Sequence, residues 1–259
     1  MKTNLGLASK IWEVVYPVGM YYVAITIGIF AAQFFFGTGN ENYMICKILG
    51  SLFAIPVIYP YYKHDLILEG TYKQKFPFSG DTMKNIVIII VCSACIGISL
   101  NNVICMSPLV EMSEGYEEAS AAFYGSTIWL ELLGSAFVTP ILEELLHRGI
   151  VYKRLRNMFG LLPAILVSSF IFAGLHFNIV QFLYAFLLGM VFALFMEQTK
   201  HLYAPILAHI TANTIAVIRT ETGILSNTVD GSVFAWIVSV LLLLIGIGGI
   251  WFYVKNDIH

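Results

Sequence analysis

Apolar segments of about twenty residues recur along the whole of this sequence. A helix needs about 20 mostly apolar residues to cross the hydrocarbon core of a bilayer, where only helices and closed barrels satisfy their own backbone hydrogen bonds. Eight segments meet this requirement. They are 14–36, 43–62, 85–106, 126–146, the two parts of the tract 161–196 on either side of a break at 176–178, 203–218 and 233–254. The sequence therefore predicts an all-α, polytopic membrane protein with about eight transmembrane helices.

The composition supports this class and excludes others. Hydrophobic residues make up 58% of the 259 residues and charged residues 12%, whereas soluble domains carry about 25% charged residues. No basic stretch is interleaved with aromatic residues, so nucleic acid is not an expected partner. No hydrophilic segment is long enough for a separate soluble domain. We therefore expect residues 1–259 to form one membrane-embedded domain, multi-pass in the cell membrane and in contact with its lipid.

The distribution of lysine and arginine predicts the orientation, because cytoplasmic loops carry an excess of these residues. With eight spans, most of them fall on one side of the membrane: Lys2, Lys10, Lys63, Lys73, Lys75, Lys84, Arg148, Lys153, Arg154, Arg156, Lys200 and Lys255. The opposite side has Arg219, with Lys47 just inside a span. Its loop 107–125 contains four glutamates and no basic residue. Both termini are therefore predicted to be cytoplasmic.

The fourth apolar segment ends in an unusual cluster of charged residues. Glu143, Glu144 and Arg148 lie where a charge at the centre of a membrane helix would cost about 2.5–3.5 kcal/mol. At about 100° per residue the two carboxylates point to different sides of the helix. Glu144 and Arg148 are four residues apart and can pair, and Glu143 has the same spacing from His147. The cluster is either a salt-bridged helix end near water or part of a functional site.

Two further polar pairs occur at the same four-residue spacing. Phe172 and His176 share one helix face, and His209 and Asn213 share another. Each pair alone is also consistent with a satisfied core histidine or with hydrogen bonds between helices. Three such polar groups on neighbouring membrane segments instead indicate that their side chains meet in one site.

A predicted turn brings two of these groups together. Gly160 is a natural helix stop and Pro163 a natural helix start, so the fourth helix is expected to continue to Phe159 and then reverse direction. Glu143 and His176 are nearly equidistant from Gly160 along the chain. In an antiparallel helix pair they would lie at about the same height.

These motifs carry a resemblance to a known family. The patterns EExxxR at Glu143, Glu144 and Arg148, FxxxH at Phe172 and His176, and HxxxN at His209 and Asn213 follow one another in this order. The chain thus resembles the CPBP family of intramembrane proteases, which includes type II CaaX prenyl endopeptidases and Abi-type proteins linked to bacteriocin immunity. The resemblance covers a core region of about residues 126–218 and implies a fold of around eight membrane helices.

The resemblance also implies roles for individual residues. Glu143 would activate water together with His176, while His209 and Asn213 would stabilise the oxyanion. Glu144 and Arg148 would support the first motif. Phe172 is expected to contact substrate. A metal-dependent version would hold Zn²⁺ by Glu143, His176 and His209, which form a familiar zinc ligand set; no organic cofactor is expected.

The implied reaction is hydrolysis of a peptide bond in a membrane-associated peptide or protein. A prenylated C-terminus, a pheromone precursor or a bacteriocin precursor would each suit a site that faces the cytoplasm, and the short loops favour a bacterial family member. Two other classes of function stay open. One is a non-catalytic bacteriocin self-immunity protein with the same fold; the other is a transporter with a buried path lined by Glu131, Glu143 and His176. No HExxH, GxSxG or GxGD motif is present.

Overall fold

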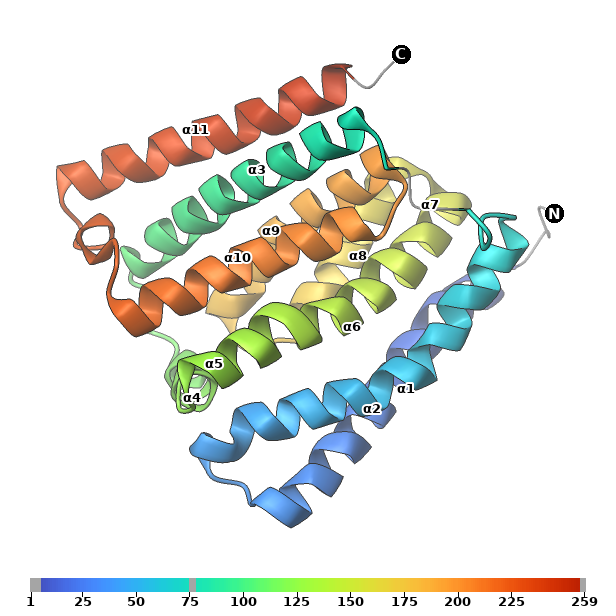
Figure 1. Ribbon diagram of the computed structural model, residues 1–259, viewed down its shortest axis with the longest axis horizontal. Coiled ribbons are helices and arrows are strands. Elements are labelled where there is room, and N and C mark those ends of the chain that lie inside the picture. The colour runs from blue at the N-terminus through green and yellow to red at the C-terminus, as the bar shows by residue number, and fades with distance from the viewer. Residues whose placement is uncertain (1–5, 75–77, 257–259) are drawn as a thin grey trace.

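The computed structural model describes residues 6–74 and 78–256, and every regular element within them is helical (Figure 1). The elements are α1 (Leu7–Phe36), α2 (Asn40–Leu68), α3 (Gly80–Cys105), α4 (Glu114–Phe123), α5 (Ile128–Glu131), the π-helical η1 (Leu132–Val138), α6 (Thr139–Leu146), the π-helical η2 (His147–Tyr152), α7 (Lys153–Phe159), α8 (Leu161–Gly174), α9 (Ile179–Thr199), α10 (Tyr203–Thr222), the 3₁₀ turn η3 (Ser226–Thr228) and α11 (Val233–Asn256). The all-α prediction is confirmed.

All eight predicted segments are helical, but they differ in length and polarity. Five helices are long and apolar enough to cross a bilayer on their own: α1, α2, α3, α9 and α11. The continuous helical segment Ile128–Phe159 would add a sixth span together with α4, from which it is bent by 107°. In contrast, α8 has only 14 residues, and α10 is not among the sufficiently apolar helices. Length and composition thus support a polytopic protein with five to six spans in the described residues.

The segment Ile128–Phe159 is the centre of the structure, and we call it the central rod. It runs from α5 through α7 and lies between the α1–α2 hairpin and a group formed by α3, α8, α9, α10 and α11 (Figure 1). The π-helical stretches η1 and η2 flank α6 on both sides. Such π-helical turns occur frequently at functional sites, and α6 is the part of the rod that carries both glutamates of the first motif.

The two predicted turns around α8 are also present. Gly160, with φ of 89°, separates α7 from α8, and this left-handed conformation favours glycine. The predicted break at 176–178 separates α8 from α9. There Asn178 caps α9 by accepting a hydrogen bond from the backbone N–H of Gln181 at 2.8 Å, as expected for an N-cap asparagine.

Small residues allow close packing of the membrane helices. A methyl group added at Gly28 of α1 would lie 2.8 Å from the Cα of Gly50 in α2, so the backbones of these helices are in direct contact. Close backbone approach at glycines is a common way for helices to associate in membranes. The hairpin is therefore tightly packed, and α2 contacts the central rod.

Candidate active site

A cavity of about 490 Å³ lies beside the central rod and is lined by residues of the rod and of the helices around it. It receives side chains from all three predicted motifs: Glu143 and His147 of the rod, Phe172 of α8 and His176 of the turn that follows it, and His209 and Asn213 of α10. The prediction that these groups meet is consistent with this arrangement. Glu144 and Arg148 do not line the cavity and lie behind it.

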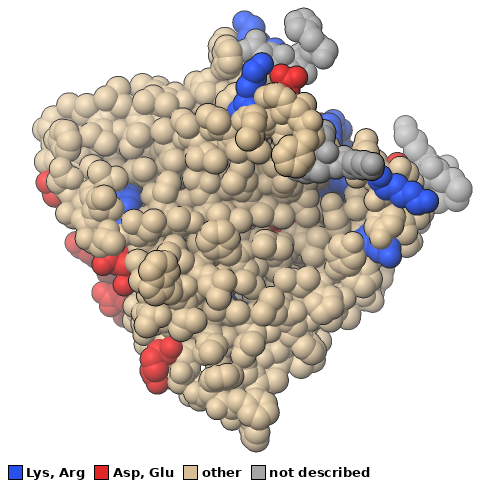
Figure 2. All heavy atoms as spheres, in the orientation of Figure 1, with Lys and Arg blue, Asp and Glu red and all other residues tan. Residues whose placement is uncertain are grey.

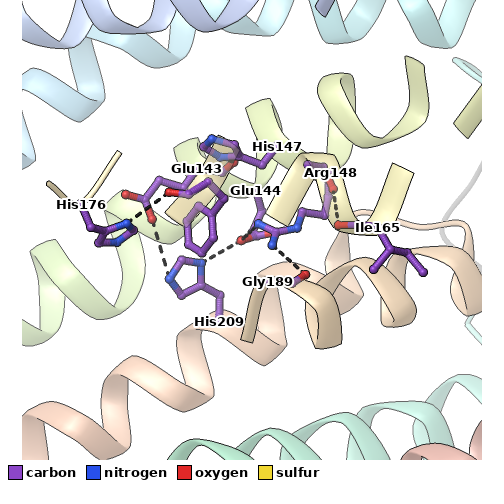
Figure 3. Close-up of polar contacts among 10 residues, drawn as sticks. Glu143, Glu144, His147, Arg148, Ile165, His176, Gly189 and His209 are labelled. Atoms are coloured by element: carbon purple, nitrogen blue, oxygen red, sulfur yellow. Dashed lines mark hydrogen bonds and ion pairs between the residues drawn. The ribbon is translucent and has the colours of Figure 1, made fainter. Parts of the chain in front are cut away.

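The two adjacent glutamates take different environments. Glu143 is 15% exposed and reaches into the cavity, where its Oε2 lies 3.7 Å from Nε2 of His209. Glu144 is fully buried. Figure 3 shows the carboxylates diverging, with Glu143 directed toward His176 and His209. This agrees with the separation expected from the helical repeat, so one carboxylate faces the cavity and the other is internal.

Glu144 links two elements of the site through one oxygen. Its Oε1 accepts a hydrogen bond from Nη1 of Arg148 at 2.8 Å and is 2.8 Å from Nδ1 of His209. The predicted pairing of Glu144 with Arg148 is therefore confirmed. The additional contact with His209 gives Glu144 the position of a carboxylate that orients an imidazole.

Arg148 is fully buried, which requires compensation for its charge. Besides the bond to Glu144, its Nη2 donates to the backbone carbonyl of Gly189 at 2.9 Å. Its guanidinium carbon lies 4.7 Å from the ring centre of Phe172 and 5.3 Å from that of Phe192. A methyl group at Gly189 would come within 3.0 Å of Nη2, so a side chain there would crowd the arginine.

Each of the three histidines that line the cavity has its Nδ1 next to an oxygen acceptor. Nδ1 of His147 is 2.7 Å from the carbonyl of Glu143, and Nδ1 of His176 is 3.2 Å from the carbonyl of Phe172. A carbonyl only accepts, so Nδ1 must carry the proton in both residues. In the neutral form Nε2 then has the free lone pair. His176 can therefore accept a proton from water at Nε2, as a general base requires.

Asn213 is positioned by a gap in the backbone hydrogen bonding of the central rod. Its Nδ2 donates to the carbonyl of Ser135 at 2.8 Å. Ser135 lies in η1, where the π-helical partner of its carbonyl would be the residue five positions later. That residue is Pro140, which has no N–H. The carbonyl is thus free to hold Asn213, whose Nδ2 keeps a second proton for another acceptor.

Phe172 is the common packing partner of the site. It is 3% exposed, and its ring centre lies 5.1 Å from that of His147, 5.3 Å from that of His176 and 5.6 Å from that of His209. Its ring edge also lines the cavity. Packing of Phe172 against His176 thus accounts for the four-residue spacing of the FxxxH motif. The expected contact of Phe172 with substrate stays a prediction.

The zinc ligand set that the resemblance implies, Glu143, His176 and His209, stays a prediction. In residues 6–74 and 78–256, no three His, Cys, Asp or Glu side chains are arranged to hold a metal ion. Glu143 and His209 approach each other, but His176 does not complete a three-ligand group with them.

Sequence reasoning did not identify several contributors. Glu131, included in the transporter alternative, is buried and does not line the cavity. The bond between Glu144 and His209, the supporting roles of Gly189 and Ser135, and the stacking of Phe192 on His209 at 4.9 Å were not expected. The only sequence signal for them was the presence of small residues within apolar segments.

Comparisons with known proteins agree with the motif assignment. Residues 125–215 match the family model described as type II CAAX prenyl endopeptidase Rce1-like, and this range includes all three motifs. A curated protein of Bacillus subtilis (strain 168), named "Putative membrane peptidase YdiL", is 36% identical over 89 residues. The match spans 34% of this chain and about a third, 36%, of that protein. No solved structure matches the chain. The resemblance to the CPBP protease family is thereby confirmed for this segment.

Proposed function

We propose that this protein is an intramembrane endopeptidase that hydrolyses a peptide bond of a membrane-associated peptide or protein. The observation that supports this function most directly is the position of His209 between two carboxylates, Glu143 on the cavity side and Glu144 on the buried side. Peptide hydrolysis needs a base, a water molecule and donors aimed at the developing negative charge. One cavity contains side chains for each of these roles.

In the proposed reaction, a water molecule binds between Glu143 and His176. Glu143 removes a proton from this water, and Nε2 of His176 accepts a hydrogen bond from its other proton. The resulting hydroxide attacks the substrate carbonyl carbon, and the electrons of the C=O bond move to oxygen. The proton held by Glu143 then passes to the amide nitrogen. The C=O bond re-forms as the C–N bond breaks, which releases the amine and the new carboxyl group.

His209 and Asn213 are proposed to stabilise the oxyanion. When His209 is protonated, its Nε2–H can donate to the oxyanion while Glu144 offsets the positive charge at Nδ1, as the carboxylate does for imidazolium in hydrolase triads. Asn213 would donate through the Nδ2 proton that Ser135 does not use. Arg148 acts indirectly, because it holds Glu144 in place.

Substitution of Asn213 tests this role. Asn213→Ala is expected to lower kcat by about 10²–10³, the usual cost of removing one oxyanion donor. Thr211→Ala is a matched control, because Thr211 lies on the same helix and donates to the backbone carbonyl of Leu207 at 2.8 Å, outside the cavity. Equal activity of the two variants at equal thermal stability would remove Asn213 from the mechanism.

A zinc-dependent mechanism predicts a different result from the metal-free mechanism proposed above. If the proposed mechanism is correct, the purified protein should keep its activity in a chelator, and elemental analysis should give the same zinc content for wild type, His176→Ala and His209→Ala. One zinc per protein molecule that is lost in both variants would instead assign Glu143, His176 and His209 as ligands.

The proposed orientation has eight membrane-crossing segments and both termini in the cytoplasm. It is supported by the concentration of Lys and Arg at one end of the helix bundle. Reporter fusions after His259 and near Glu114 are expected to give cytoplasmic and external signals, respectively. An external signal after His259 would overturn the proposed orientation.

A further inference from the structure

The two ends of the helix bundle differ strongly in charge. The end that contains the connections α2–α3, α7–α8 and α9–α10, here called the basic end, carries most of the described basic residues: Lys10, Lys63, Lys73, Lys84, Lys153, Arg154, Arg156, Lys200 and Lys255. The opposite, acidic end contains the connections α1–α2, α3–α5, α8–α9 and α10–α11. It carries Glu41, Glu111, Glu114, Glu117, Glu118, Glu221 and Asp230. Figure 2 shows most of the visible Lys and Arg at one end and most of the visible Asp and Glu at the other, with an exception of each sign.

The active-site cavity is bordered by elements of the acidic end. Helix α4, which lies in the acidic connection between α3 and α5, contributes Tyr116, Ser120 and Phe123 to the lining. The α8–α9 turn contributes Phe177, which is 83% exposed. Tyr43, near the start of α2, lines the cavity and is 36% exposed. The exposed parts of the lining thus include residues at this end of the bundle.

Toward the basic end, the path from Glu143 is blocked by the protein itself. Every residue from Glu144 to Tyr152 along the central rod is buried. Arg148 fills the space between the rings of Phe172 and Phe192 and the backbone of Gly189. A second cavity of about 480 Å³ at the basic end shares no lining residue with the first. Among the described residues, the lining of the cavity that holds Glu143 therefore reaches the acidic end of the bundle and not the basic end.

We infer that substrate reaches the active site from the external side of the membrane. The inference rests on the proposed protease function and on the general excess of basic residues in the cytoplasm, which places the acidic end outside. The substrate class is then a membrane-anchored or exported polypeptide whose scissile segment lies at the external surface. A cytoplasmic tail, including a prenylated C-terminus, would approach the closed basic end.

Access can be measured independently of activity with single cysteines. In a Cys105→Ser background, which removes an exposed native thiol, Ser120→Cys would report on the cavity and Asn157→Cys on the basic end. A membrane-impermeant maleimide is expected to label Ser120→Cys in intact cells and Asn157→Cys only after the cells are disrupted. Labelling in the reverse order would overturn the inference.

Cleavage from each side gives the second measurement. The probe is a single-span reporter with a short randomised segment next to its membrane span, placed outside the membrane in one library and in the cytoplasm in the other. In cells, the wild type is expected to cleave the external library and the Glu143→Gln variant neither. In detergent, the wild type should cleave members of both libraries. Cleavage in cells of the cytoplasmic library alone would refute external access while leaving the protease function intact.

The two proposals can fail separately. If the purified wild type cleaves neither library in detergent, the protease function fails, and the cysteine labelling still decides from which side the cavity is reached.

Discussion

Replacing Glu143 with glutamine is expected to lower the rate of peptide hydrolysis by about 10²–10⁴, the usual contribution of a positioned general base. Glutamine keeps the size of the side chain and its hydrogen-bonding capacity but removes the basic carboxylate. Glu143 is partly exposed to the cavity, so the neutral side chain leaves no buried charge unpaired. The variant should therefore fold as well as the wild type, and the loss should be seen in kcat with a membrane-anchored peptide substrate.

Glu131→Gln is the matched control for this prediction. Glu131 is a buried glutamate of the same central rod, and its Oε1 accepts a hydrogen bond from the backbone N–H of Ser126 at 3.3 Å. Glutamine can keep that bond through its carbonyl oxygen. Because Glu131 does not line the cavity, its replacement should leave activity close to wild type. Full proteolysis by Glu143→Gln in a clean preparation would refute the assignment of the base.

A double substitution tests whether Glu143 and His176 act on the same water. His176→Ala alone should be about as harmful as Glu143→Gln. Residues that act as one catalytic unit give strongly non-additive effects, so the double variant should be little worse than either single variant. Multiplied losses would indicate that the two side chains act in different steps.

Contacts within one helix were predictable from the sequence because helical geometry fixes which residues share a face. The pairing of Glu144 with Arg148 and the divergence of Glu143 from Glu144 follow from spacing alone. The α7–α8 hairpin was predictable for a similar reason. Gly160 ends α7, and residues at equal distances before and after this turn lie at about the same height in the hairpin. The helical content followed from the apolar segments.

Contacts between helices were not predictable in the same way. Glu144 and His209 are 65 positions apart, and their hydrogen bond depends on how α10 packs against the central rod. The π-helical stretches change the rotation of side chains along that rod, and no spacing rule indicated them. Apolar length also did not distinguish a spanning helix from the 14-residue α8, because α8 and α9 form one continuous apolar tract in the sequence.

Loss of the Arg148 side chain is expected to have the largest effect on stability. Arg148→Ala would leave the Glu144 carboxylate fully buried with only His209 as a partner. Removing one member of a buried ion pair costs about 3–5 kcal/mol. The same change also removes packing against the rings of Phe172 and Phe192. Folded yield and thermal stability in detergent should both fall clearly.

Comparison with a second ion pair and with a charge-free variant separates the stability effect from the catalytic one. Arg156→Ala is the control. Arg156 is 40% exposed where it pairs with Glu197, and Glu197 would keep Tyr152 and Lys200 as partners, so this loss should cost less. The double variant Glu144→Gln/Arg148→Met removes both buried charges and should recover part of the lost stability. It should not recover activity, because His209 would still lack the carboxylate at Nδ1 that offsets its charge when it donates to the oxyanion. Unchanged thermal stability in Arg148→Ala would show that the pair does not stabilise the fold, and full activity in the double variant would show that Glu144 does not act through His209.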